Sequence, residues 1–179
     1  QNSNEVWRWS PFDHFNMNDY DAYGGTWWNA AFDDNGYDWM HSNAFHFDEE
    51  ESAIYFSSRH LSRITKIDYP SGEIIWNHRI LKEAQFTEKG LITRVKKFAP
   101  SGAAVWNAPG VDIEDGRVFF GTGQSTQSPA SEFSDAIISL NLKTGEKLWS
   151  TQTLSGDAHN VGCEIPVIKR MTCPEEDGP

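Results

Sequence analysis

The alternation of apolar and polar residues predicts short β-strands along most of the chain. Runs with a period of two occur in two pairs: MHSNAFHF (40–47) with SAIYFSS (52–58), and AAVWNAPGVDI (103–113) with RVFFGTG (117–123). A period of two places successive side chains on opposite faces of a strand. Residues 80–98 alone show some helical periodicity, and a glycine and several β-branched residues weaken it. The pattern therefore predicts an all-β fold.

Two stretches of the chain repeat each other without a gap. ITKIDYPSGEIIW (64–76) aligns with IISLNLKTGEKLW (137–149), so that Trp76 matches Trp149 at a period of 73 residues. In each copy, alternating apolar residues lead to an Asp or Asn, and a Ser-Gly or Thr-Gly pair then supplies the turn. A second strand follows and ends in a tryptophan that we expect to be buried. SNEVW (3–7) fits the end of the same pattern, so the chain contains an internal repeat.

The repeat predicts a β-propeller. Each copy, taken with the two strand-like runs before it, makes a unit of four strands with a glycine turn and a terminal tryptophan, which is the outline of a propeller blade. Propellers close with about four to eight blades, and this sequence supplies two blades and the last strand of a third. We therefore expect a partial propeller whose open edges need further blades from the same or another chain. An excerpt of a longer protein is the favoured interpretation.

The chain is acidic, and its acidic residues are concentrated in the first part. The formal net charge is −11, and residues 1–78 hold 13 Asp and Glu against 4 Lys and Arg. A nucleic acid or an anionic membrane surface would repel such a chain, so we expect neither as a partner. No run of about 18 apolar residues occurs, so we also expect no membrane span.

One acidic stretch offers oxygen ligands of the kind that calcium prefers. The candidates lie in NMNDYDAYGG and are Asn16, Asn18, Asp19 and Asp21. The stretch lacks the 12-residue pattern of an EF-hand, and crowded carboxylates more often form a solvated surface. The surface interpretation is therefore preferred to a metal site.

The two cysteines, Cys163 and Cys173, lie ten residues apart in a segment without strand patterning. No histidine stands between or just beyond them, and two thiols alone do not complete a zinc site. A disulfide is the preferred interpretation, and it would place the chain in an oxidising compartment, in the periplasm or outside the cell. Two free thiols in a cytosolic loop are the alternative.

The first part of the chain carries three motifs in order. They are VWRWSPFDHF (6–15), DWMHSNAFHFD (38–48) and IYFSSRHLSRITKIDYPSGEIIW (54–76). Over residues 5–77 this order resembles the arylsulfotransferase family, which transfers sulfate esters without a nucleotide donor and requires no cofactor. The resemblance implies a six-bladed propeller whose central channel binds the aryl sulfate. It places His41 and Arg59 at two positions of the sulfate site.

His41 and Arg59 also suit an anion site by their chemistry. Arginine presents a planar fork of N–H groups to sulfate oxygens. A nearby histidine can donate a hydrogen bond or relay a proton to the phenol oxygen. A pair that only lines the channel, without a catalytic role, is the alternative.

The covalent nucleophile that the family implies is not identified in this chain. It should be a histidine well downstream of the Ser-Ser-Arg motif, and neither His78 nor His159 has the matching context. We expect His46 and His60, which flank the pair, to be structural or exposed. The sequence therefore predicts a sulfate clamp without its nucleophile.

The second part of the chain carries different motifs. They are SGAAVWNAPGVD, then VFFGTGQSTQSPASEFSDAIISLNLKTGEKLW, then GDAHNVGC and CPEEDGP. Over residues 100–179 they resemble the pyrroloquinoline-quinone (PQQ) dehydrogenases, which implies an eight-bladed propeller locked by tryptophan-docking motifs. The family's calcium-binding Asn and catalytic Asp are replaced here by Gln124 and Asn160. Because an amide cannot act as a base, the resemblance implies a relative with altered or no quinone chemistry.

The change of resemblance divides the chain. We expect an arylsulfotransferase-like blade at 1–79 with a long acidic and aromatic insertion at 10–38, a connector at 80–99 and a PQQ-dehydrogenase-like blade at 100–179. Such a chain is a mosaic of interchangeable blades, a fragment, or a composite of separate stretches. Three functions follow. The first is sulfuryl transfer with an aryl sulfate or another small anionic or aromatic ligand, the second is oxidation with PQQ and calcium, and the third is a non-catalytic assembly module.

Overall fold

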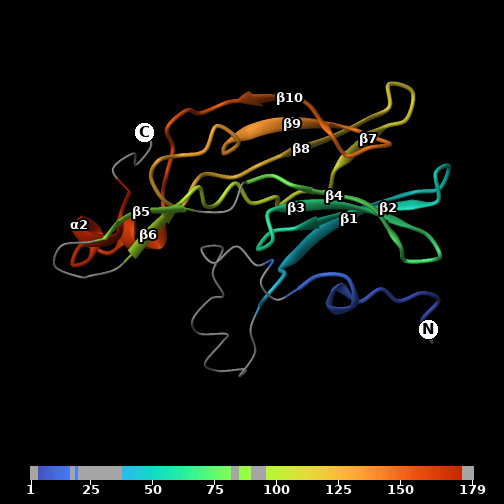
Figure 1. Ribbon diagram of the computed structural model, residues 1–179, viewed down its shortest axis with the longest axis horizontal. Helices are drawn as coiled ribbons and strands as arrows, with labels where there is room; N and C mark the ends of the chain where they lie inside the picture. Colours follow the sequence, from blue (N-terminus) through green and yellow to red (C-terminus); the bar gives the residue numbers. More distant parts are fainter. Residues whose placement is uncertain (1–3, 17–18, 20–37, 82–84, 90–95, 175–179) are drawn as a thin grey trace.

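The computed structural model describes residues 4–16, 19, 38–81, 85–89 and 96–174, and it is built almost wholly from β-sheet (Figure 1). The first sheet contains β1 (Ser42–Asp48), β2 (Ala53–Ser58), β3 (Arg63–Asp68) and β4 (Ile74–Arg79). The second contains β7 (Gly110–Asp112), β8 (Arg117–Gly121), β9 (Ala136–Asn141) and β10 (Lys147–Gln152). Both sheets are antiparallel and keep the strands in chain order. The all-β prediction and the two four-stranded blades are confirmed.

Three small elements complete the described chain. A two-stranded hairpin of β5 (Gln85–Lys89) and β6 (Lys96–Ala99) occupies the stretch that shows weak helical periodicity. Thr87, the β-branched residue of β5, fits a strand better than a helix. The 3-10 helix η1 (Pro11–Asp13) lies near the N-terminus, and η3 (Val161–Glu164) with the short α2 (Lys169–Thr172) lies near the other end. No helix among the described residues is long and apolar enough to cross a membrane.

The repeated turns have the chemistry that the sequence predicts. Asn141 accepts hydrogen bonds on its side-chain oxygen from the backbone N–H groups of Lys143 and Thr144, at 2.9 and 3.0 Å. Gly145 follows with a φ of +69° and donates its N–H to the Asn141 carbonyl. In the first sheet, Gly72 has a φ of +81° and donates to the carbonyl of Asp68. Both glycines occupy a backbone conformation that other residues rarely adopt.

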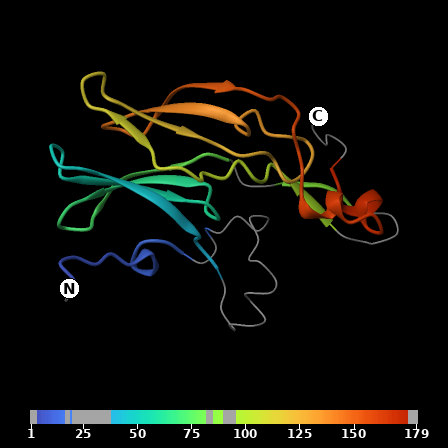
Figure 2. The ribbon, with the colours of Figure 1, turned by 180° about the vertical axis from the view of Figure 1, so that it is seen from behind.

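The two sheets pack face to face, and their facing side chains form the main core (Figures 1 and 2). This core includes Ala53, Tyr55, Ile64 and Trp76 from the first sheet and Val118, Phe120, Ile138 and Leu140 from the second. Trp76 marks the contact. Its Nε1–H donates to the Leu142 carbonyl at 3.0 Å, and its indole lies so close to Gly145 that a Cβ there would stand 2.6 Å from the ring. The terminal tryptophan of one blade therefore docks on the glycine turn of the next.

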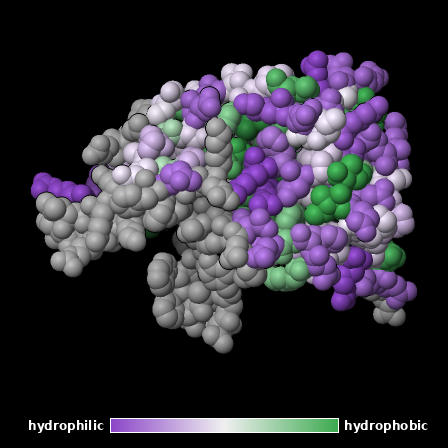
Figure 3. Space-filling view, viewed as in Figure 1, coloured by the Kyte–Doolittle hydropathy of each residue, from purple (hydrophilic) through white to green (hydrophobic). Residues whose placement is uncertain are grey.

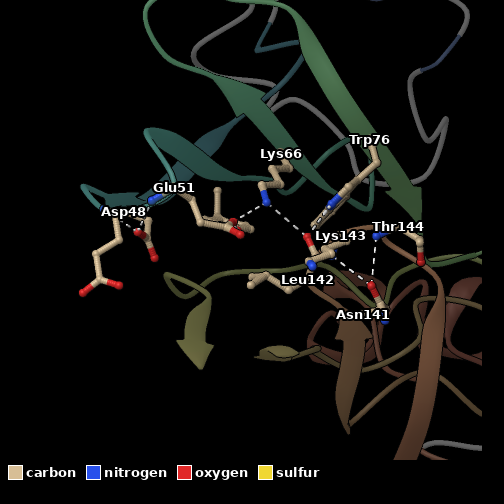
Figure 4. Close-up of polar contacts among 10 residues, drawn as sticks. Asp48, Glu51, Lys66, Trp76, Asn141, Leu142, Lys143 and Thr144 are labelled. Carbon is tan, nitrogen blue, oxygen red and sulfur yellow. Dashed lines mark hydrogen bonds and ion pairs between the residues drawn. The ribbon is translucent and has the colours of Figure 1, made fainter. Parts of the chain in front are cut away.

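A buried lysine reinforces the same contact (Figure 4). The Lys66 Nζ donates to the Leu142 carbonyl at 3.2 Å and also pairs with the Glu51 carboxylate. Glu51 in turn accepts a hydrogen bond from the Tyr55 hydroxyl at 2.8 Å. Burial, together with this contact to Glu51, raises the pKa of Tyr55, which keeps its hydroxyl protonated.

The N-terminal segment repeats the docking contact on the first sheet. Trp7 donates its Nε1–H to the Pro70 carbonyl at 2.9 Å, and Trp9 donates to the Gly72 carbonyl at 3.0 Å. A Cβ at Gly72 would lie 3.3 Å from the Trp9 ring. Trp7, which ends the N-terminal partial copy of the repeat, and the nearby Trp9 therefore cover the turn of the first blade, as Trp76 covers the turn of the second.

The prediction that Trp149 is buried is wrong in this structure. Its side chain is 40 % exposed, whereas Trp76 is 8 % exposed. Trp149 pairs across the sheet with Ser139, which pairs with Phe119, so the three side chains lie on one face of the second sheet, which we call the open face. The Trp149 and Phe119 rings lie 6.0 Å apart, the same separation as Trp76 and Tyr55. The tryptophan is placed for docking, but no described residue supplies a turn to cover it.

The exposed apolar side chains agree with a partial propeller. Ile137 and Leu148, on β9 and β10, are each nearly half exposed beside the open face. Figure 3 shows apolar residues reaching the surface among polar ones on the side seen there. Apolar surface left at the end of a sheet stack is typical of a site where another protein element packs.

The C-terminal part is closed by a disulfide. Cys163 in η3 is bonded to Cys173, which directly follows α2, with 4.6 Å between their Cα atoms. The disulfide prediction is confirmed.

Candidate functional site

His41 and Arg59 lie together at one end of the first sheet. His41 directly precedes β1 and Arg59 directly follows β2, and the Arg59 N–H donates to the His41 carbonyl at 3.2 Å. The φ of His41 is +46°, an unusual value for a residue other than glycine. Ala103, which donates its N–H to the backbone carbonyl of Gln124 in the second half of the chain, also has a positive φ, of +48°.

Asp38 connects the charged residues of the site. Its carboxylate pairs with Nδ1 of His41, and its backbone carbonyl contacts Nδ1 of His60 at 2.7 Å. The His41 and His60 rings are 4.9 Å apart. Asp38 stands in the DWMH motif, three residues before His41, so a search for acidic partners of that histidine would have found it. We did not predict a role for Asp38 from the sequence.

The protonation states follow from these contacts. A carbonyl oxygen only accepts, so Nδ1 of His60 carries the proton that joins it to Asp38. Burial lowers the pKa of His60, which keeps this fully buried ring neutral at neutral pH. Burial also lowers the pKa of Arg59, while the charge of Asp38 opposes that shift. Arg59 stays protonated, because an arginine guanidinium is not deprotonated in proteins.

Trp106 reaches the site from the second half of the chain. Its ring centroid lies 3.7 Å from the Arg59 Cζ, so the guanidinium covers the indole face. The same indole meets the His41 ring edge to face at 6.3 Å. No sequence signal joins Trp106 to Arg59, because 47 residues separate them and only the packing of the two sheets brings them together.

Asp38, His41 and His60 are the described side chains that offer a set of metal ligands. One ligand atom from each lies within 4.8 Å of the others. Two histidines and a carboxylate suit a borderline ion such as Zn²⁺. The Arg59 charge acts directly on His60 and Asp38, however, and a cation beside a guanidinium is disfavoured. The site thus offers a carboxylate with two imidazoles that could hold a cation, and a guanidinium that could pair with an anion.

The residues that the PQQ resemblance implies are engaged in the backbone framework. Gln124 is exposed, and its backbone carbonyl accepts a hydrogen bond from the Ala103 N–H at 3.0 Å. The Asn160 side chain accepts from the Gly162 N–H at 2.8 Å, and its Nδ2 donates to the carbonyls of Thr126 and Thr172. Asn160 thus caps η3 and holds three segments together. A role for Gln124 or Asn160 in binding a cofactor stays a prediction.

The calcium candidates are only partly within the described residues. Asn18 and Asp21 lie outside them. The Asp19 carboxylate accepts from the Arg63 guanidinium at 2.6 Å and from the Asn16 backbone N–H at 2.8 Å. Arg63 therefore already neutralises the Asp19 carboxylate, and a calcium site in this stretch stays a prediction.

Asp135, which directly precedes β9, should make the stability of the fold depend on pH. Burial and the charge of Asp157 raise its pKa to about 6. A folded-state pKa above the unfolded value means that ionisation opposes folding, so this residue adds stability as the pH falls from about 6 towards 4. We expect Asp135→Asn to raise the free energy of unfolding at pH 7 by about 1–3 kcal/mol and to have little effect at pH 4. Urea unfolding at the two pH values measures this, and a variant less stable at pH 7 would contradict it.

Comparison with known proteins identifies the family. The model of the arylsulfotransferase (ASST) family matches residues 1–106, more than half of the 179 residues. The chain belongs to the arylsulfotransferase family. The match runs past the expected boundary at residue 79 and ends at Trp106. It therefore includes the whole first sheet and the site residues Asp38, His41, Arg59, His60 and Trp106.

Relatives of a second kind are also found. Polyvinylalcohol dehydrogenase from Pseudomonas sp is 30 % identical over 118 residues, which cover 65 % of this chain and 18 % of the relative. The dehydrogenase subunit of alcohol dehydrogenase (quinone) from Gluconacetobacter polyoxogenes is 26 % identical over 105 residues, 59 % of this chain and 11 % of the relative. The chain thus spans less than a fifth of the length of these relatives. Both resemblances inferred from the sequence are confirmed.

Two solved structures share weak similarity with the chain. The quinohemoprotein alcohol dehydrogenase ADHIIG from Pseudomonas putida HK5 gives a TM-score of 0.31 with 15 % identity, over 60 % of this chain and 26 % of that one. BamB from Moraxella catarrhalis gives a TM-score of 0.27 with 17 % identity, over 64 % and 38 %. The partial propeller is established by the two blade-like sheets themselves and by the docking contact between them.

Proposed function

We propose that this chain forms part of a propeller enzyme that transfers the sulfuryl group of an aryl sulfate ester to a phenolic acceptor without a nucleotide donor. The observation that supports the proposal is the meeting of Arg59 with the Asp38–His41 pair at one end of the first sheet. These residues combine a fixed positive charge with a histidine whose orientation is set by a carboxylate. That combination suits an anionic ester whose leaving oxygen must be protonated.

Arg59 is proposed to bind the sulfate oxygens. Its guanidinium is always charged and presents N–H groups in the plane of the group, which matches two oxygens of one sulfate. Partial burial strengthens this attraction, because fewer water molecules screen the charge. Charge that shifts onto the sulfuryl oxygens during transfer is stabilised by the same N–H groups.

His41 is proposed to handle the proton of the phenolic oxygen. Its Nδ1 is held by the Asp38 carboxylate, which leaves Nε2 to face the ligand. As the bond between the phenolic oxygen and sulfur breaks, Nε2 gives its proton to the departing oxygen. The sulfuryl group moves to the acceptor, whose hydroxyl proton passes to Nε2 and restores it, so that one phenol and one sulfate ester are consumed and one of each is formed.

We further propose that other blades complete the propeller and that the protein works outside the cytoplasm. The open face around Trp149 and the coverage of longer relatives support further blades, from the same chain or from another. The Cys163–Cys173 disulfide supports an oxidising compartment such as the periplasm or the cell exterior.

A PQQ-dependent oxidoreductase is the second candidate, and the names of the dehydrogenase relatives favour it. It would need PQQ and calcium near Gln124 and Asn160, although the Asn160 side chain is already engaged by three backbone groups. A non-catalytic assembly module is the third candidate.

One experiment separates the three. The full-length protein is incubated with 4-nitrophenyl sulfate and phenol, and the release of 4-nitrophenol is followed together with the formation of phenyl sulfate. A second sample is reconstituted with PQQ and calcium and examined for a bound-quinone absorbance. Turnover in the first sample supports sulfuryl transfer. Absorbance in the second without turnover in the first would replace that proposal by the oxidoreductase, and neither signal would leave the assembly module.

A further inference from the structure

We infer that Trp106 positions Arg59 for anion binding, so that the sulfate subsite is built jointly by the two halves of the chain. This inference rests on the proposed function and adds a residue that neither resemblance assigns to sulfate binding. The observation that supports it is the contact between the Arg59 guanidinium and the Trp106 ring, where 3.7 Å separate Cζ from the ring centroid.

The geometry of this contact directs the arginine. A guanidinium that lies over an indole has its face covered, while its N–H groups point outwards in the plane of the group. Sulfate oxygens bind along that plane, so the indole holds Arg59 in the orientation that a two-point contact requires. A free arginine side chain would lose more conformational freedom when it binds the anion. The contact therefore lowers the entropic cost of binding in advance.

Trp106 is itself held firmly, although its side chain is half exposed. The segment before it pairs with the chain that follows β8, through the hydrogen bonds of Ala103 with Gln124 and of Gly123 with Ala104, at 3.0 and 2.9 Å. The indole rests on Gly123, where a Cβ would stand 3.1 Å from the Trp106 Nε1. The absence of a side chain at residue 123 is what gives the indole its place beside Arg59.

The two halves are tied together next to this contact. The Ser62 hydroxyl donates to the Gly102 carbonyl at 3.1 Å in a buried position, and the Ser62 N–H donates to the Arg59 carbonyl at 3.1 Å. Gly102 has a φ of +91°, and a Cβ there would stand 2.4 Å from the Gln124 carbonyl. The loop that bears Arg59 and the segment that bears Trp106 thus share one hydrogen-bonded frame.

The test uses three variants of the full-length protein, Trp106→Ala, Trp106→Phe and Trp106→Leu. Phenylalanine keeps an aromatic face for Arg59, whereas leucine keeps apolar bulk without one, so the two form a matched pair. The affinity for inorganic sulfate is measured by calorimetry. We expect the dissociation constant to rise about tenfold for alanine and leucine and about twofold for phenylalanine. In turnover, KM should rise for alanine and leucine while kcat changes little, because ground state and transition state lose the same contact.

A second measurement reports on the contact without any ligand. In the wild-type protein the Arg59 Nε–H resonance should be shifted upfield by the ring current of Trp106, and this shift should vanish in Trp106→Leu. Equal sulfate affinity for the phenylalanine and leucine variants would overturn the inference, as would an unshifted Arg59 resonance in the wild type. A wild type that shows the shifted resonance but binds no sulfate would remove the proposed function and the anion role of Trp106, and leave the contact itself as structural.

Discussion

Replacing Arg59 by alanine should abolish turnover of the aryl sulfate, with a fall in kcat/KM of at least about a thousandfold. The guanidinium is proposed to bind the sulfuryl oxygens both before and during transfer, so its loss affects binding and reaction together. Arg59→Lys should recover only a small part of the activity. A lysine keeps the charge, but it has no planar fork for two oxygens and cannot lie flat on Trp106 in the same way.

His41→Ala should lower kcat by about a hundredfold to ten-thousandfold, because the departing phenolic oxygen loses its proton donor. A substrate whose phenol is a strong acid needs that proton less, so the loss should be smaller for 4-nitrophenyl sulfate than for phenyl sulfate. The measurement is the rate of phenol release from both esters by each variant.

His46→Ala is the matched control for these two variants. His46 lies on β1, five residues beyond His41, and its ring is near Tyr55. It should retain turnover close to the wild-type rate. If His46→Ala lost activity as His41→Ala does, or if Arg59→Ala kept activity within a few-fold of the wild type, the assignment of the site would be wrong.

The parts of the fold that depend on local pattern were predictable from the sequence. Alternation placed β1, β2 and β8 within about two residues, whereas only Gly110–Asp112 of the expected run 103–113 forms a strand. The Asp or Asn with its following glycine located the turns that end at Gly72 and Gly145. The cysteine spacing indicated the disulfide. Each of these features is determined by residues close together in the chain, so the pattern contains the information.

The burial of a tryptophan depends on what packs over it, and the sequence misled there. Trp76 and Trp149 occupy equivalent places in the repeat, yet one is covered by the turn of the next blade and the other is not. The same limit applies to the site. His41 and Arg59 were found through a motif, but Trp106 enters only because the second sheet packs on the first.

The packing of the halves also bears on the mosaic character of the chain. The arylsulfotransferase match crosses the expected boundary at residue 79 and ends at Trp106, the residue that reaches back to Arg59. The hydrogen bonds of Trp76 and Lys66 to the Leu142 carbonyl extend the contact to the far end of the second sheet. These contacts join the two parts of the chain into one packed unit at both ends of the sheets.

Lys66→Ala should destabilise the fold by about 3 kcal/mol, measured as the free energy of unfolding in urea. Lys66 is buried between the sheets, where its ammonium pairs with Glu51 and donates to the Leu142 carbonyl (Figure 4). Removing it leaves a carboxylate without its counter-charge and a carbonyl with one donor fewer. The affected carbonyl is also the acceptor of Trp76, so the docking contact between the blades should weaken as well.

The double variant Lys66→Met with Glu51→Leu distinguishes the cost of an unpaired charge from a general need for polar groups. Replacing both partners removes the charges together and fills the space with apolar side chains, a change that is often nearly neutral in other proteins. We expect the double variant to recover at least half of the stability that Lys66→Ala loses. If it were as unstable as Lys66→Ala, the hydrogen bonds lost with the pair, from Lys66 to the Leu142 carbonyl and from the Tyr55 hydroxyl to Glu51, would account for the loss, and the unpaired charge would not.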